Sequence, residues 1–299
     1  MQKIKTKLII NSNNSMKFVI GTAQIKKGYG ILGNHLRLSE AKKILVEKRK
    51  NIDFVDTAPS YGISEKYLGK NLNKNIKIIT KIDKLKSKEK KEVSKEIEEK
   101  IIKSFKKFKR TIYCVLFHNQ EDAKWLKEKI IRSKFKELIK DNYIKKIGVS
   151  CYQYKDIEYY CKIFKFDVFQ IPLNVLNIRK DKIDNLKKLK RRYGFEVHAR
   201  SVFLQGVLLM QSYELPKKLR SIKKKLDQIK IFIEKKKIKK TDFLISIIDN
   251  LNLVKCIIIG FKKFNEFEEI LNYKKTKLDS KDIYRYRIRK ETVIDPRYW

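Results

Sequence analysis

The sequence predicts an α/β fold in which eight parallel strands, each followed by a helix, close into a (β/α)8 TIM barrel. The chain has 299 residues, and one such barrel needs about 250. Short segments rich in Ile, Val, Phe and Tyr alternate with longer amphipathic segments along the chain. Strands that alternate with helices form parallel sheets, and a closed sheet leaves no unpaired edge strand. These observations together favour the barrel.

Eight segments have the composition of strands that are buried on one or both faces. They are rich in β-branched and aromatic residues, which pack well on the pleated surface of a sheet. Each is bounded by a polar or helical segment, as the alternation requires. We predict strands over residues 18–23, 52–58, 76–82, 111–118, 144–151, 167–173, 195–202 and 255–261.

Between these strands the apolar residues recur at helical spacing. Ser39 is the predicted N-cap of the helix that follows the first strand. A long charged helix follows the third strand, because a single apolar stripe runs along it. That stripe consists of Val93, Ile97, Ile101, Phe105 and Phe108. We predict further helices within residues 121–139, 153–164, 181–192, 217–236 and 264–273.

A doubly wound open sheet is the alternative arrangement of the same elements. Such sheets usually carry a glycine-rich turn, GxGxxG, after the first strand, and the segment here reads GTAQIKKGYG (21–30). With four prolines and ten glycines, the chain offers few places for a linker. We therefore expect one domain over residues 1–299, with an N-terminal segment (1–17) that caps the barrel and a C-terminal tail (280–299) outside it.

The net charge of the chain is +40, and strong positive charge can indicate a nucleic acid or an anionic membrane as partner. Of the 74 basic residues, however, 61 are lysines, and acidic residues are interleaved with them, as in KSKEKKEVSKEIEEK (86–100). Proteins that read nucleic acids more often concentrate arginine and aromatic residues. We interpret the charge as a compositional bias of exposed helix faces and expect no specific nucleic-acid partner.

One segment of the tail departs from this even distribution. Residues 284–290 read YRYRIRK and alternate an apolar side chain with a basic one. Such alternation suits stacking on bases, but it also describes an edge strand or extended segment whose apolar side packs on the barrel. We favour packing on the barrel.

The sequence indicates neither a membrane span nor a disulfide nor a metal site. No stretch approaches the ~18 uninterrupted apolar residues of a membrane span, and the first residues lack the apolar run of a secretory signal. The cysteines follow no pairing or metal-binding pattern, so we expect reduced thiols. They are Cys114, Cys151, Cys161 and Cys256. We therefore expect a cytoplasmic protein.

In a barrel of this kind the active site lies at the carboxyl ends of the strands. The second predicted strand carries Asp56 near its end, and Tyr61 lies in the following loop. Lys81 lies near the end of the third predicted strand, and His118 ends the fourth. Three consecutive strands thus bring a carboxylate, a phenol, an amine and an imidazole to one mouth.

These four groups suit the reduction of a carbonyl. Delivery of a hydride leaves an alkoxide that needs a proton, and a tyrosine with the ordinary pKa of about 10 is a poor donor. A neighbouring Lys81 ammonium lowers the pKa of Tyr61, and Asp56 keeps that lysine charged and in place. A neutral His118 can form a hydrogen bond with the substrate oxygen and orient it.

The sequence resembles the aldo-keto reductases from about residue 18 to residue 273. The motif DTAPSYGISEKYLG (56–69) carries the resemblance. It implies that the catalytic tetrad of the family falls on Asp56, Tyr61, Lys81 and His118. The further matching segments are GTAQ (21–24), ITK (79–81), LFHN (116–119), GVS (148–150), FQIPLNVLN (169–177), ARSVFLQGVLL (199–209) and IIIGFKK (257–263).

The resemblance also implies a set of cofactor-binding residues. From the nicotinamide end to the adenosine end, they are Ser150, Gln170, Arg200, Ser201, Gly260, Phe261, Lys262 and Lys263. The first two match residues that bind the carboxamide, the next two contact the nicotinamide face and pyrophosphate, and the last four form the adenosine-phosphate loop. Two positions depart from the family pattern: Cys151 replaces an asparagine, and Glu269-Ile270 replaces a Glu-Asn pair near the adenine.

The resemblance implies an NAD(P)(H)-dependent oxidoreductase that acts on a small-molecule carbonyl. NADPH is the expected cofactor, with NADH as the alternative. The sequences of residues 169–177 and 199–209 are similar to those of bacterial members associated with surface-sugar biosynthesis. This similarity favours a sugar or nucleotide sugar as the substrate. Tyr29, Trp125 and His35 are candidates for the substrate wall. The alternative function is a non-catalytic, cofactor-sensing or regulatory barrel that binds an anionic partner.

Overall fold

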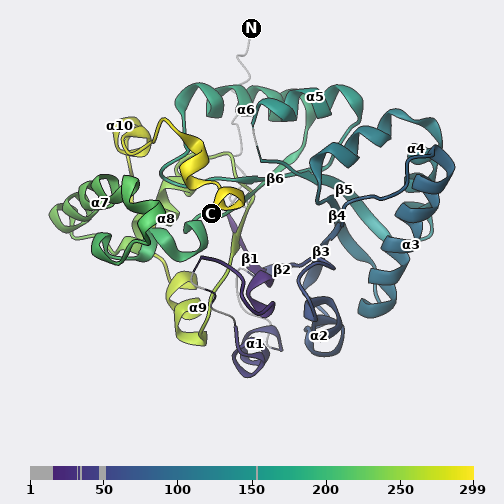
Figure 1. Cartoon of the computed structure of the whole chain (residues 1–299), viewed down its shortest axis with the longest axis horizontal. Coiled ribbons are helices and arrows are strands. Elements are labelled where there is room, and N and C mark those ends of the chain that lie inside the picture. Colours follow the sequence, from purple (N-terminus) through teal and green to yellow (C-terminus); the bar gives the residue numbers. More distant parts are fainter. Residues whose placement is uncertain (1–15, 32, 34–35, 47–51, 153) are drawn as a thin grey trace, which may run out of the picture.

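The computed structural model describes residues 16–31, 33, 36–46, 52–152 and 154–299. Eight parallel strands pair in chain order and β8 pairs with β1, so the sheet is a closed barrel surrounded by helices (Figure 1). The (β/α)8 prediction is confirmed, and the doubly wound alternative is wrong. The strands are β1 (Lys17–Gly21), β2 (Ile52–Asp56), β3 (Lys77–Ile82), β4 (Ile112–Phe117), β5 (Ile144–Ser150), β6 (Val168–Pro172), β7 (Glu196–Arg200) and β8 (Cys256–Ile259).

All eight strands lie within two residues of their predicted bounds. The predicted runs extend past the strands chiefly at their carboxyl ends, because those residues already turn into the loops of the barrel mouth. The helices are α1 (Leu38–Leu45), α2 (Ser64–Asn71), α3 (Lys90–Phe108), α4 (Lys129–Lys140), α5 (Lys155–Ile163), α6 (Lys180–Tyr193), α7 (Lys223–Lys236), α8 (Lys240–Asp249), α9 (Phe264–Leu271) and α10 (Ser280–Tyr284).

The apolar core divides into two parts. A small cluster comes from the strands alone and fills the barrel; its members are Val19, Phe54, Ile79, Cys114, Leu116, Val168 and Cys256. A larger cluster packs the outer faces of the strands against the helices. The predicted stripe of α3 belongs to the larger cluster: four of its five residues are buried, and Phe105 is partly buried against them. All four cysteines are free and buried, as expected.

Three predicted helical stretches differ in detail from the structure, and one of them, 217–236, begins as a 3-10 helix (Lys217–Ile222) before α7. Ser39 is not an N-cap, because α1 begins at Leu38 and the carbonyl of Arg37 accepts the first helical bond, from Ala41. The chain enters the helix early because Leu36 is buried and its amide donates to the carbonyl of Gln24. The stretch predicted over 121–139 begins as a 3-10 helix (Gln120–Lys127) before α4.

The C-terminal tail crosses the mouth of the barrel (yellow in Figure 1). It comprises α10 and two 3-10 helices, Glu291–Ile294 and Pro296–Tyr298. Tyr286 is fully buried, with its ring edge-on to Phe243 at a centroid distance of 5.9 Å. The expected packing on the barrel is therefore confirmed, but the expected edge strand is wrong, because the segment ends a helix and then turns.

Two further expectations concern the ends and the surface of the chain. The predicted N-terminal cap lies almost wholly outside the described residues, which begin at Met16. None of the helices in the described part of the chain is long and apolar enough to span a bilayer. Of the lysines whose burial the structure describes, only Lys81 is buried, so the positive charge lies on the outer surface.

Candidate active site

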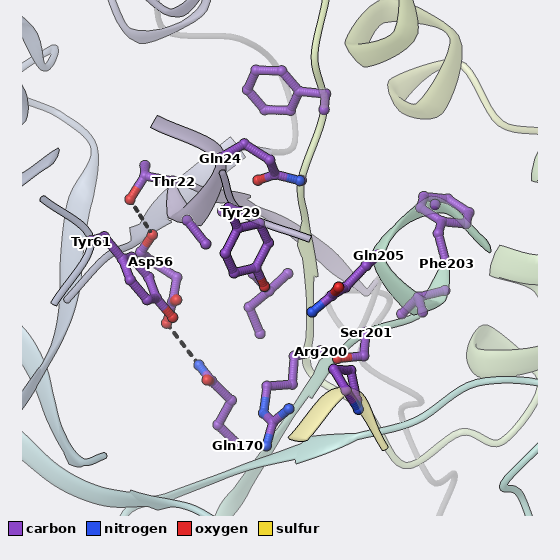
Figure 2. A pocket seen from close by; sticks show the side chains of 18 of the residues that line it. Thr22, Gln24, Tyr29, Asp56, Tyr61, Gln170, Arg200, Ser201, Phe203 and Gln205 are labelled. Atoms are coloured by element: carbon purple, nitrogen blue, oxygen red, sulfur yellow. Dashed lines mark hydrogen bonds between the residues drawn. The ribbon is translucent and has the colours of Figure 1, made fainter. Parts of the chain in front are cut away.

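A cavity of about 540 Å³ opens at the carboxyl ends of the strands. Figure 2 shows Tyr29, Tyr61 and Asp56 along one part of its wall, with Arg200 and Ser201 across from them. Its lining comes from the loops after several strands and from Pro296–Arg297 of the tail. The barrel therefore gathers residues far apart in sequence into one site.

Asp56 and Lys81 form a buried ion pair at the floor of this cavity. The Nζ atom of Lys81 lies 2.6 Å from Oδ1 of Asp56, and it also donates to the backbone carbonyl of Thr57 at 2.8 Å. The two side chains are only 2% and 5% exposed. Burial would lower the pKa of Lys81, but the Asp56 carboxylate and Tyr61 raise it above its ordinary value. The lysine is therefore charged.

The second oxygen of Asp56 is held by Gln170. The side-chain amide of Gln170 donates to Oδ2 of Asp56 at 2.7 Å (Figure 2). The resemblance to the aldo-keto reductases implies that Gln170 binds the nicotinamide carboxamide. The structure adds its contact with Asp56, which holds that carboxylate in position. This bond uses one of the two amide hydrogens of Gln170, so its carbonyl oxygen and its second N–H are the groups left for a ligand.

Tyr61 lies beside the lysine, as predicted. The Nζ atom of Lys81 is 4.9 Å from the centroid of the Tyr61 ring. Burial raises the pKa of Tyr61, and the Lys81 charge offsets only part of that rise, so the net shift is upward. The sequence-based expectation of a lowered pKa is wrong for the protein alone, because burial outweighs the ammonium.

His118 joins this group from the end of β4. Its ring meets that of Tyr61 edge-on at a centroid distance of 6.1 Å. Its Nδ1 lies 3.2 Å from Oδ1 of Asp83 and 3.4 Å from the hydroxyl of Ser60. Burial would raise the pKa of Asp83, but hydrogen bonds from His118 and Ser60 hold it below its ordinary value. An ionised carboxylate only accepts, so Nδ1 of His118 carries a hydrogen.

The predicted nicotinamide-end residues also lie at this cavity. Ser150, Gln170, Arg200 and Ser201 all line it. The guanidinium of Arg200 packs over the ring of Tyr152 at 4.5 Å, and its Nε is buried without a partner among the described residues. A buried donor without an acceptor is costly, so this atom marks a place where a ligand oxygen fits.

The loop after β8 supplies three of its four predicted residues to the lining: Gly260, Phe261 and Lys262. Glycine at 260 leaves room for Gln24, because a Cβ atom there would lie 1.8 Å from the side-chain amide of Gln24 and would displace it. Lys263 does not line the cavity; it is the N-cap residue of α9 and is exposed. The adenosine end of the predicted site is thus present, with Lys263 at its outer edge.

Several residues at the site were not predicted as site residues. Asp83 does not line the cavity but holds His118, and it gave no signal, because a carboxylate two residues past Lys81 matters only through that contact. Arg297 reaches the cavity from the last residues of the chain, and its guanidinium stacks on Tyr152 at 3.7 Å. Gln24 also lines the cavity and lies in the short 3-10 helix (Ala23–Ile25) after β1. Its segment, GTAQ, belongs to the resemblance, but no role was predicted for Gln24.

The remaining candidates have different outcomes. Tyr29 lines the cavity, and burial raises its pKa to about 12, with Tyr61 adding to the rise. Trp125 is partly buried against the core and does not line the cavity. His198 is fully buried and bonded to Glu196, as expected of a structural histidine. His35 lies outside the described residues.

Comparison with known proteins agrees with this geometry. The aldo/keto reductase family model matches residues 17–288. The chain belongs to this family. It is therefore an oxidoreductase of the general kind that the family comprises, and the family generally uses nicotinamide cofactors. A search of curated protein sequences found no significant match.

Solved aldo-keto reductase structures share the fold. A glycerol dehydrogenase from Gluconobacter oxydans is similar over 89% of this chain and 88% of its own, with a TM-score of 0.65 and 18% identity. An aldo-keto reductase from Bacillus halodurans in its holo form is similar over 90% of both chains, with a TM-score of 0.65 and 15% identity. At this identity the likeness concerns the barrel alone.

Proposed function

We propose that this protein is an NAD(P)(H)-dependent enzyme that interconverts a carbonyl and an alcohol, with Tyr61 as general acid in reduction and general base in oxidation. The observation that carries the proposal is the buried Asp56–Lys81 ion pair, with its ammonium 4.9 Å from the centroid of the Tyr61 ring. The three residues lie at a cavity open to small molecules. A purely binding protein has no need of this arrangement.

Each of the three residues has a distinct part in proton transfer. A reduced nicotinamide, when bound, supplies the hydride. The carbonyl oxygen that becomes an alkoxide takes the Tyr61 proton, which is present at neutral pH because burial raises the Tyr61 pKa. The Lys81 ammonium stabilises the negative charge that Tyr61 acquires at that moment. Asp56 keeps Lys81 charged and holds it in position.

His118 and Asp83 orient the substrate oxygen. Asp83 fixes the hydrogen of the imidazole on Nδ1, so Nε2 is the atom free for a substrate oxygen. As a neutral ring it accepts from an alcohol; as an imidazolium it donates to a carbonyl.

The lining indicates which ligands fit. Residues 150, 170, 200 and 201 would hold the nicotinamide end of the cofactor, and residues 260–262 its adenosine end. Lys262 and Lys263 favour NADPH by their charge, whereas neighbouring carboxylates favour NADH, so the cofactor class is NAD(P)(H). Polar groups of Gln24, Tyr29 and Gln205 on the cavity wall suit a hydroxylated carbonyl compound such as a sugar or nucleotide sugar.

The test combines binding with turnover. Fluorescence titration of the protein with NADPH and NADH measures binding, and the loss of reduced cofactor is then followed with a panel of aldehydes, ketones and sugars. We expect saturable binding and substrate-dependent oxidation of the cofactor. Tight cofactor binding without turnover across the panel would instead support the regulatory barrel, and binding of neither cofactor would reject both functions.

A further inference from the structure

Two carboxylates occupy the start of α9, where the adenosine end of the cofactor site lies. The backbone amide of Lys262 donates to Oε2 of Glu266, and that of Phe264 donates to Oε2 of Glu40, each at 2.8 Å. We propose that Glu266 and Glu40 make this enzyme prefer NADH to NADPH. The inference rests on the proposed function and concerns the same site.

The first observation is the use of the backbone donors. Amides at the start of a helix point outward and bind phosphate groups in many proteins, because they have no partner within the helix. Here two amides of that kind already bind carboxylate oxygens. A 2′-phosphate would have to displace one or both carboxylates to reach them. NADH carries a neutral 2′-hydroxyl in place of this phosphate, and that group does not require these amides.

The second observation is the charge of the two acids. Hydrogen bonds from Lys43 and from the amide of Phe264 lower the pKa of Glu40, so it is ionised at neutral pH. Both its oxygens are held, one by Lys43 at 2.9 Å and one by the amide. Glu266 lies in the first turn of α9, where the helix dipole favours a negative side chain. The negative charge of Glu266, and that of Glu40 where Lys43 does not balance it, therefore oppose a phosphate that carries about two negative charges of its own.

The third observation places Glu266 in the site itself. Glu266 and Lys262 both line the cavity that holds Tyr61 and Asp56. A carboxylate at the adenosine end accepts hydrogen bonds from ribose hydroxyls, which is how acidic residues select NAD in dinucleotide-binding folds. Glu266 can do the same here, since its Oε1 is not the atom that binds Lys262.

The lysines do not reverse this preference. Lys263 is exposed and outside the cavity lining, so salt screens its attraction to a phosphate. Lys262, Lys263 and Lys43 carry three positive charges, and Glu40 and Glu266 carry two negative ones, with Lys43 at 2.9 Å from Glu40. Because the charges nearly balance, the occupied amides decide which cofactor fits.

The test is a comparison of dissociation constants for NADH and NADPH, measured by fluorescence titration without substrate. We expect the wild-type protein to bind NADH at least about tenfold more tightly, the effect of ~1.4 kcal/mol. Glu266→Gln removes a charge, and Glu266→Ala also frees the Lys262 amide. The ratio of the NADPH to the NADH dissociation constant should therefore decrease in Glu266→Gln and decrease further in Glu266→Ala, mainly through tighter NADPH binding. Glu40→Gln should act in the same direction.

The controls separate this inference from the proposed function. Glu99→Gln removes an exposed carboxylate on α3, which pairs with Lys95, and should leave the ratio unchanged. Thermal unfolding verifies that each variant is folded. Tighter NADPH binding by the wild-type protein, or an unchanged ratio in folded Glu266→Ala, would overturn the preference and leave the proposed function intact. Binding of neither cofactor would overturn both.

Discussion

Clusters of charged side chains occur at both ends of the barrel, and they are alike in composition, although only the one at the mouth is fully buried. At the mouth, Asp56 pairs with Lys81 at 2.6 Å. At the opposite end, Glu196 at the start of β7 binds Lys146 and Lys255, each at 2.6 Å, and lies 3.2 Å from Nε2 of His198. Each cluster thus contains a carboxylate held by basic side chains.

The clusters differ in what they leave free. The Glu196 carboxylate is bound by three side chains, and neither it nor its partners line the cavity. At the mouth, Lys81 has a third neighbour, the Tyr61 hydroxyl, whose proton faces a cavity. An ion-pair cluster alone therefore indicates a contribution to the stability of the fold. An ion pair with a transferable proton beside it, at a cavity that can hold a substrate, indicates a catalytic site. Variants of the two clusters should separate these effects.

The largest effect is expected from Lys81→Met. The substitution leaves the buried Asp56 carboxylate without its cation, which costs about 3–5 kcal/mol in the free energy of unfolding. It also removes the charge that stabilises the Tyr61 phenolate, so turnover should fall by roughly 10²–10⁴-fold. Chemical denaturation and steady-state kinetics measure the two effects. Lys77→Met, on the exposed start of the same strand, is the matched control and should change neither greatly.

Glu196→Gln should affect stability alone. Lys146 and Lys255 would lose a partly buried charged acceptor, at a cost of about 1–3 kcal/mol. Turnover per folded molecule should stay within about twofold of wild type, because the cluster lies at the far end of the barrel from Tyr61. A large fall in turnover at unchanged stability would show that the two clusters are not separate in function.

The pH dependence of the free energy of unfolding should distinguish the wild-type protein from Glu196→Gln. Burial would raise the pKa of Glu196, but hydrogen bonds from His198 and the two lysines hold it well below its ordinary value. A lowered pKa contributes stability that is present above the unfolded value of about 4.3 and is lost as the pH falls toward the folded pKa. The difference in the free energy of unfolding between wild type and Glu196→Gln should be constant from about pH 8 to 5 and should decrease below about pH 4.3. A difference that increased in acid would contradict the assigned sign.

The strands, and the meeting of Asp56, Tyr61, Lys81 and His118 at one cavity, could be predicted from sequence because each depends on local pattern or on the order of motifs. Helix α8 could not, since its residues 242–248 are all buried and no polar face reveals a helical period. Helix α2 is short and mostly polar, so it gives little signal. Asp83, Arg297 and the two acids at α9 could not be assigned either. Their roles come from contacts that exist only after the barrel closes.

The most direct measurement is a crossed comparison of Tyr61→Phe with Glu196→Gln, in which cofactor binding, single-turnover chemistry and thermal stability are measured for both. We expect Tyr61→Phe to bind the cofactor and unfold like wild type while the chemical step slows by roughly 10²–10⁴-fold. Glu196→Gln should show the reverse, with normal chemistry and lower stability. Undiminished single-turnover chemistry in folded, cofactor-bound Tyr61→Phe would contradict the account.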